Sequence, residues 1–184
     1  MRKYFAKLNS GFTMIELLIV IAVLGILAVA VISAINPIEQ INRSKDTGSR
    51  SDAEQFIGGV DRFYTAKGYY PWQDNPTDGN ENAAAWLNLS QTSDNVVNKV
   101  EENLSNSTSE LKQSFRTRIT QTNYNPLWIY NRGTQGNSTY VCFKPVSGAF
   151  QNEAWGRCAS LPSDLDTVNA SVCNSSTNVY SCLP

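Results

Sequence analysis

One carboxylate in this sequence stands in surroundings that disfavour charge. Glu16 lies in an apolar run from Phe12 to Ile35, whose 24 residues contain only two other polar side chains, Thr13 and Ser33. Burying a carboxylate in lipid is disfavoured by about 2.5 to 3.5 kcal/mol at the bilayer centre, and by less near an interface. Glu16 therefore needs a positively charged partner.

The chain offers no such partner nearby. No Lys, Arg or His stands between Lys7 and Arg43. Cleavage between Gly11 and Phe12 would supply one, because the new α-amino group of Phe12 is positive. The same end of a neighbouring helix could then lie against Glu16.

The apolar run predicts a membrane-spanning helix. Leu17 to Ile35 has one polar residue in 19, and a helix of that length covers about 28 Å, close to the hydrocarbon thickness of a bilayer. A buried core helix is the alternative, but such helices are usually shorter and have a polar face. No polar face is visible in this run.

The residues before the run set its orientation. They include Arg2, Lys3 and Lys7 and no acid, so the leader is expected to stay in the cytoplasm and the C-terminal bulk outside. A secretory signal places its cleavage site after the apolar run. Here the small residue Gly11 comes before it.

Together these residues resemble the processing site of the type IV pilin family, which includes pilus subunits and type II secretion pseudopilins. The similarity covers about the first 30 residues and is carried by the stretch GFTMIELLIVI, Gly11 to Ile21, after a short basic leader. It implies that a prepilin peptidase cuts after Gly11 and N-methylates Phe12, and that Glu16 neutralises the amine of an adjacent subunit during assembly.

Two further positions bear on this resemblance. Gly25 falls where many members have a helix-loosening glycine, whereas Ser33 stands where many have a proline, and Pro37 follows four residues later. The fold implied is α+β: a long N-terminal helix, transmembrane in its first half, packed on an antiparallel sheet with disulfide-tied C-terminal loops.

The region after the run reads as a second helical stretch. Pro37 should kink or restart the helix because it lacks a backbone donor. Apolar residues then recur at helical spacing, and Gly68 with Pro71 is a helix stop. The stripe consists of Ala53, Phe56, Ile57, Val60, Phe63 and Tyr64.

These signals divide the chain into a basic leader, an assembly helix, an amphipathic helix and a head. The head has a first part of loops and short helices and a second part with the sheet and the cysteines. The predicted ranges are 1–11, 12–36, 37–67 and 68–184, with the head divided into 68–125 and 126–184.

Short helices are expected in the first part of the head. Ala83 to Leu89 is one, and a second follows from an apolar stripe at Val96, Val97, Val100 and Leu104. Ser107 and Glu110 have capping-box spacing before a third stripe, Leu111, Phe115 and Ile119.

From Pro126 the pattern changes to strands. Residues 127–130 and 139–143 are expected to pair as a hairpin, with Gly133 to Asn137 as its loop, and 179–182 to form a third, edge strand. Lys144 to Asn178 is loop-rich and short of apolar runs.

The cysteines and the missing histidines limit the possible chemistry. The chain has no histidine, which excludes Ser/His/Asp and Cys/His mechanisms. Four cysteines outside the membrane indicate two disulfides, and their spacing does not favour zinc. Three pairings remain open: 142 with 158 and 173 with 182 closes the smallest loops, while 142 with 182 would join two strands. The cysteines are Cys142, Cys158, Cys173 and Cys182.

Acidic residues give two weaker candidate sites. Asp74 and Asp78, in a turn-rich loop, could offer oxygen ligands to calcium, but the spacing lacks the full calcium-loop pattern and no cofactor is predicted. Asp164 and Asp166 could be cast as acid and base of a membrane-anchored extracytoplasmic enzyme or binding domain. Turn or capping roles fit them better, so no catalytic residue and no enzyme activity is predicted.

The net charge of the chain says little about which partners the protein binds. Without residues 1–11, the chain keeps 12 Lys and Arg and 16 Asp and Glu, a net charge of about −4. The basic residues of the head are dispersed among acids, which does not favour nucleic acid.

The leading hypothesis is therefore a structural subunit of a type IV pilus-like surface filament, and the close alternative is a pseudopilin of a type II secretion system. The expected partners are further copies of the chain, a prepilin peptidase, an inner-membrane assembly platform and, before assembly, the lipid bilayer. The expected location is a single-pass membrane protein that becomes extracellular in the pilus.

Overall fold

A computed structural model describes residues 11–77, 84–91, 93–133 and 138–184. The chain divides into two compact units between Ile38 and Glu39. The first unit contains the apolar helix, and the second contains an α+β head built around an antiparallel sheet.

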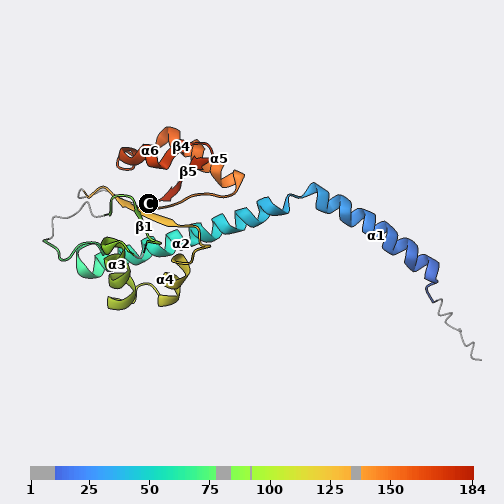
Figure 1. Cartoon of the computed structure of the whole chain (residues 1–184), viewed down its shortest axis with the longest axis horizontal. Helices are drawn as coiled ribbons and strands as arrows, with labels where there is room; N and C mark the ends of the chain where they lie inside the picture. The colour runs from blue at the N-terminus through green and yellow to red at the C-terminus, as the bar shows by residue number, and fades with distance from the viewer. Residues whose placement is uncertain (1–10, 78–83, 92, 134–137) are drawn as a thin grey trace, which may run out of the picture. The chain divides into compact units, whose positions relative to one another are not determined.

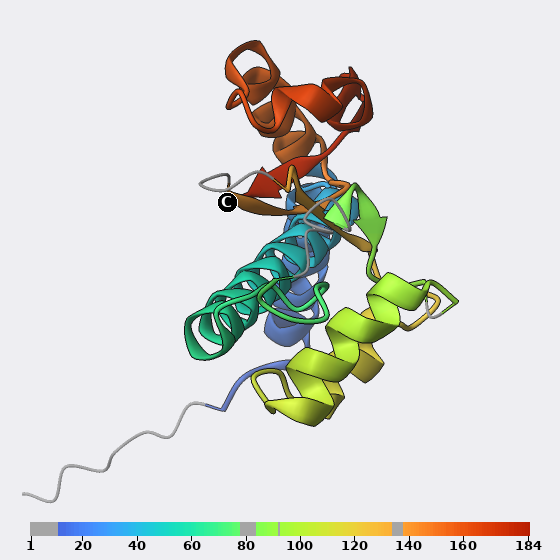
Figure 2. The ribbon, with the colours of Figure 1, turned by 90° about the vertical axis from the view of Figure 1, so that its left-hand side faces the viewer.

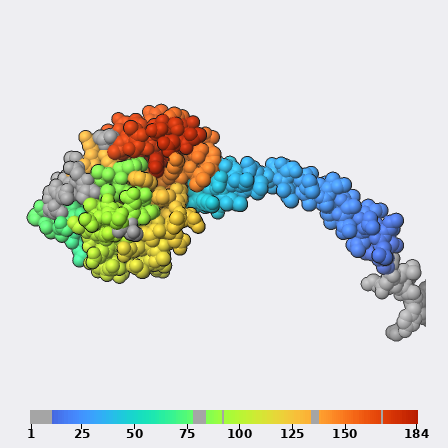
Figure 3. Space-filling model, viewed as in Figure 1, coloured from blue at the N-terminus to red at the C-terminus, as the bar shows by residue number. Residues whose placement is uncertain are grey.

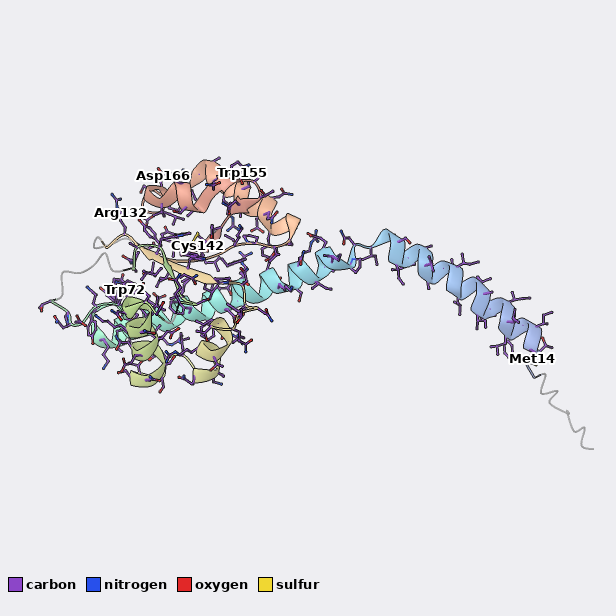
Figure 4. All side chains as sticks on the ribbon, in the orientation of Figure 1. Met14, Trp72, Arg132, Cys142, Trp155 and Asp166 are labelled. Carbon is purple, nitrogen blue, oxygen red and sulfur yellow. A yellow bond between two sulfur atoms is a disulfide. The ribbon has the colours of Figure 1, made fainter. Side chains whose placement is uncertain are left out.

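The first helix, α1, spans Met14–Ala34. Its 21 residues are long and apolar enough to cross a bilayer, and none of its side chains is buried. Figure 4 shows the side chains of α1 projecting on all sides of the helix, beginning at Met14. In the described part of the chain, α1 is the helix that meets these criteria.

The second helix, α2, spans Pro37–Lys67. The predicted restart at Pro37 is confirmed, because α1 ends at Ala34 and the residue before a proline avoids the helical region. The predicted stop is also confirmed: Gly68 has φ +79°, a left-handed conformation that suits glycine, and its N–H donates to the carbonyl of Tyr64 at 2.8 Å.

α2 packs along one face of the sheet (Figure 1). Four of the six predicted stripe residues are buried in the main core, namely Ala53, Phe56, Val60 and Phe63. Ile57 is partly buried against this core, whereas Tyr64 is 44% exposed and stacks on Tyr70 with ring centroids 4.6 Å apart.

The main sheet has four antiparallel strands in the order β1-β2-β3-β6. Their bounds are Leu87–Asn88, Leu127–Asn131, Thr139–Phe143 and Ser181–Leu183. The predicted hairpin of β2 and β3 is confirmed, with Leu127 opposite Phe143. Most of its loop lies outside the described residues. Because side chains alternate across a strand, Leu127 and Ile129 join the α2 core while Trp128 and Tyr130 face the other side.

The predicted helix at Ala83 to Leu89 is wrong over its described part, where β1 pairs Leu87 with Ile129. Trp86, just before β1, has φ 55°, which a right-handed helix does not allow. Seven residues make only about two helical turns. Such a short helix is less stable than the hydrogen bonds that this segment can make with the free edge of β2.

The other two short helices form where the apolar stripes predict them. α3 spans Asn95–Glu101 and continues as a π-helical turn, η2, over Glu102–Ser107, and α4 spans Gln113–Ile119. The predicted capping box is wrong: Lys112 is the N-cap of α4, and the Glu110 carboxylate instead accepts a hydrogen bond from Arg62 at 2.7 Å.

The C-terminal region covers the other face of the sheet (Figures 1 and 2). It was expected to be loop-rich, but it contains the ten-residue helix α5, Gly148–Arg157, and several short elements. These are η3 (Cys158–Ser160), η4 (Asp166–Val168), α6 (Asn169–Val172), β4 (Cys173–Ser175) and β5 (Asn178–Val179). In the space-filling view this region forms a continuous upper layer of the head (Figure 3).

The disulfides pair Cys142 with Cys182 and Cys158 with Cys173. The expected pairing of 142 with 158 and 173 with 182 is therefore wrong. Strand register explains the difference, because β3 and β6 are neighbours and place Cys142 directly opposite Cys182. The second disulfide then closes the segment that covers the outer face of the sheet.

Candidate functional site

The N-terminal turn of α1 holds the predicted assembly residue Glu16 against Thr13, which follows the predicted cleavage pair directly. Thr13 is the N-cap, and Glu16 lies three residues later in a capping box. Glu16 Oε2 accepts hydrogen bonds from the Thr13 backbone N–H at 2.8 Å and from the Thr13 hydroxyl at 2.7 Å. In return, the Glu16 N–H donates to the Thr13 hydroxyl oxygen at 3.3 Å. This geometry holds the carboxylate at the start of the helix, beside Phe12.

The same turn is open to contact. Phe12 is 86% exposed and Met14 92% exposed. Glu16 makes no ion pair with any described residue. A carboxylate in the first turn of a helix is stabilised by the positive end of the helix dipole, so the charge of Glu16 is favoured at this position. Both residues of the predicted cleavage pair, Gly11 and Phe12, are described, whereas residues 1–10 of the predicted leader lie outside the described residues.

The remaining surface of α1 is uniformly apolar. Apart from Glu16, the polar side chain in Met14–Ala34 is Ser33, whose hydroxyl donates to the carbonyl of Val29 at 2.9 Å. At Gly25 a Cβ would meet no atom within 4 Å. Since none of the α1 side chains is buried by the described residues, the whole helix surface can contact lipid or other helices.

Asp164 and Asp166, which were weighed as an acid–base pair, have structural roles. The Asp164 carboxylate accepts hydrogen bonds from the Tyr140 hydroxyl at 2.8 Å and from the Ser138 N–H at 3.1 Å. Partial burial acts to raise the pKa of Asp164, but these hydrogen bonds outweigh it and hold the pKa below its usual value. Asp166 accepts a hydrogen bond from the Asn169 side chain at 3.0 Å. Asp164 thus fastens the C-terminal cover to β3.

The calcium candidates are not brought together by the described residues. Asp74 pairs with Lys99 at 2.6 Å, and Asp78 lies outside the described part of the chain. No group of three or more His, Cys, Asp or Glu side chains with metal-binding geometry occurs among the described residues. Asp74 and Asp78 stay weak calcium candidates that nothing tests.

Sequence reasoning missed a pair of carboxylates on α2 that hold the start of α5. Asp46 is fully buried and accepts hydrogen bonds from the N–H of Val146 at 2.9 Å and of Ser147 at 2.8 Å. Glu39 accepts from the N–H groups of Gly148 and Ala149, both at 3.3 Å. We call Glu39 and Asp46 the carboxylate clamp.

The hydrogen bonds of the carboxylate clamp change the pKa of Glu39. Burial acts to raise the pKa of Glu39, but the hydrogen bonds from Gly148, Ala149 and Arg43 outweigh it, and the pKa is lowered. The sequence did contain a signal for the start of α5, because Ser147 is a favourable N-cap residue and does cap this helix. Nothing in the sequence indicated that α2 would supply the acids.

One comparison with known proteins identifies the N-terminal segment. Residues 6–32 match the family model described as the prokaryotic N-terminal methylation motif, which is the type IV prepilin-like signal. No curated protein and no solved structure gives a significant match to the chain. The match covers the last six residues of the predicted leader, the predicted cleavage pair, Glu16 and most of α1.

Proposed function

We propose that this chain, which carries the type IV prepilin-like signal, is a structural subunit of a type IV pilus-like surface filament. Prepilin peptidase would cut between Gly11 and Phe12 and methylate the new amine. The observation that carries the proposal is α1, an apolar helix of 21 residues with no buried side chain, joined to a folded head. The motif and the helix support a structural role and membrane anchoring.

The physical reason is that α1 is stable only in lipid or against other helices. Apolar surface that leaves the bilayer must be buried again, and packing between copies of α1 provides that burial. The head is a separate compact unit with its core around α2 and the sheet, and it would stay outside the helix bundle.

Glu16 would set the axial register of the bundle. In the single chain its carboxylate is satisfied by Thr13. In a filament the Phe12 amine of an adjacent copy would replace or join that partner, because a slip along the axis leaves both charges unpaired in apolar surroundings. The partners in this proposal are further copies, the peptidase, an inner-membrane assembly platform and, before assembly, the bilayer.

Replacing Glu16 tests the proposal. Glu16→Ala should accumulate in the membrane but be absent from sheared filaments, measured by immunoblot of both fractions. The matched control is Glu54→Ala, which removes an exposed carboxylate from α2 and should leave filament yield unchanged. Normal filament yield from Glu16→Ala would contradict the register pairing.

The type II secretion pseudopilin is the second candidate, because the methylation motif is compatible with both roles. Its filament would be short and would drive secretion. Negative-stain images of cells that express the chain at native level distinguish the two: long surface fibres built mainly of this chain favour the pilus. An anchored enzyme is not favoured, because Asp164 and Asp166 are engaged in structural hydrogen bonds.

A further inference from the structure

The outer edge of β6 carries unpaired backbone groups at Cys182. β6 is an edge strand of the main sheet and pairs with β3 on its other side. Cys182 lies directly opposite Cys142, and their Cα atoms are 4.0 Å apart. Opposite residues of antiparallel strands come this close where they do not hydrogen-bond to each other, whereas hydrogen-bonded pairs are about 5.5 Å apart. The N–H and C=O of Cys182 therefore point away from β3.

The hydrogen bonds across the sheet give the same direction. The carbonyl of Leu127 in β2 accepts from the Leu89 N–H at 2.8 Å, so the backbone groups of Leu127 face β1. Phe143 lies opposite Leu127 and therefore faces β6, where it pairs with Ser181. Since successive residues of a strand bond to opposite sides, Cys182 faces the outer edge.

The C-terminal cover pairs with this edge only as far as Tyr180. The Tyr180 N–H donates to the Val172 carbonyl at 2.9 Å. Val172 ends the helix α6, so the chain before it provides no further extended neighbour. Outside the ladder with β3, no hydrogen bond from the Cys182 backbone to the described residues is found. Cys182 thus offers one donor and one acceptor to another extended chain.

A pocket of about 240 Å³ opens beside this edge and is lined by Cys182 itself. Its floor is apolar, because Tyr140, Leu165 and Val172 are buried in the cluster on the outer face of the sheet. An apolar cavity of about 150 Å³ is large enough to bind benzene. The pocket therefore has room for an aromatic side chain, and the rings of Tyr140 and Tyr180 can pack against it.

The charged side chains near the pocket already have partners. Arg157, which lines the pocket, forms an ion pair with Glu153. The Asp164 carboxylate accepts a hydrogen bond from the Tyr140 hydroxyl at 2.8 Å. Shape and backbone hydrogen bonds, rather than charge, therefore select the occupant.

We propose that this edge and pocket bind an extended segment of another protein by strand addition, with an aromatic side chain in the pocket. Residues opposite each other on neighbouring strands point their side chains to the same face, so the aromatic residue would lie opposite Cys182. Its N–H and C=O would bond to Cys182, while the pocket would select its side chain. The site lies within the head, so the inference goes beyond the proposed filament role and does not depend on it.

Peptide titration tests the side-chain preference. The probes are dye-labelled, threonine-rich short peptides with phenylalanine, tyrosine or tryptophan at the centre, and the full chain is held in phospholipid nanodiscs. Fluorescence anisotropy should show binding, and a central aspartate should weaken it at least about tenfold, because the pocket buries an apolar ring. Equal affinity for the aspartate peptide, or no binding of any aromatic peptide, would overturn the proposal.

Backbone methylation tests strand addition separately from the pocket. N-methylation of the central aromatic residue removes the donor that faces Cys182 and should abolish binding. N-methylation of the next residue, whose N–H faces away, is the matched control and should leave the affinity unchanged. Equal affinities for the two methylated peptides would overturn the proposal.

Hydrogen exchange locates the contact on the protein. The bound aromatic peptide should slow exchange of the Cys182 amide, whereas the amides of Ser181 and Leu183 already belong to the ladder with β3 and should not change. Unchanged exchange at Cys182 would overturn the proposal. Trp155→Ala removes an exposed aromatic side chain of α5 outside the pocket and should bind the peptide normally. Loss of binding in this variant would place the peptide on α5 and would also overturn the proposal.

Discussion

Asp46 Oδ2 lies 2.8 Å from the backbone nitrogen and 2.6 Å from the hydroxyl of Ser147, which is 101 residues further along the chain. Its Oδ1 accepts a third hydrogen bond, from the Val146 N–H. Ser147 is also the N-cap of α5. One buried carboxylate on α2 therefore fixes where the C-terminal cover begins.

Removing this carboxylate should destabilise the head strongly. Asp46→Ala leaves three donors without an acceptor, two of them on the buried Ser147, which should lower the free energy of unfolding by about 3 to 5 kcal/mol. Urea unfolding of the mature protein in detergent, followed by tryptophan fluorescence, measures the change. Glu54→Ala, on the exposed side of the same helix, should change it by less than about 0.5 kcal/mol. A loss below about 1 kcal/mol for Asp46→Ala would mean that the clamp is not needed for folding.

Acid should weaken the attachment of the C-terminal cover. The pKa values of Glu39 and Asp164 are lowered from 4.5 and 3.8 in the folded protein. A carboxyl with a lowered folded pKa contributes stability that is fully present above its unfolded pKa and is lost as the pH falls through its folded pKa. Stability should therefore fall as the pH drops from about 5 toward and through the lowered pKa values of the folded protein.

The control for this pH effect is the double variant Glu39→Gln, Asp164→Asn. It should be less stable at neutral pH and should show a shallower fall over the same range. Urea midpoints measured at several pH values compare the two proteins. Parallel pH profiles would show that other carboxyls govern the acid response.

The two disulfides should differ in their effect on stability. Cys142 and Cys182 are separated by 40 residues, and Cys158 and Cys173 by 15. Loop-closure entropy predicts losses of about 4 and about 3 kcal/mol when each pair is replaced by serine. Thermal unfolding of the two double variants measures the order, and peptide mapping without reduction checks the pairing. Peptides that join 142 to 158 would contradict the strand register.

The mature protein should begin at Phe12. Intact-mass and N-terminal peptide analysis of membrane-derived protein should show loss of residues 1–11 and one added methyl group on the amine. Gly11→Leu should block cleavage, because it puts a bulky side chain at the proposed cut in place of the small residue there, and should leave the precursor in the membrane. A native protein that keeps Met1 would remove the positive partner proposed for Glu16.

Several features of this protein could be read from the sequence because their causes are local. Hydropathy alone identifies α1, and the stripe from Ala53 to Phe63 with the stop at Gly68 identifies α2. Strands β2 and β3 follow from β-branched and aromatic runs with a turn between them. The GFTMIE stretch is part of the methylation motif, which the sequence shows because that signal is itself a short linear motif.

Other features depended on which distant segments meet. The pairing of Cys142 with Cys182 follows from β3 and β6 being neighbours, and β1 forms because β2 offers it a free edge. The cover over the sheet is held by Asp46 and Asp164. Their partners Ser147 and Tyr140 lie 101 and 24 residues away in the sequence. Local periodicity carries no information about such contacts. The sequence by itself determined the apolar helix and its methylation motif. Only the tertiary structure decided how the head is closed, because buried carboxylates and cysteines find partners through the packing of the whole domain.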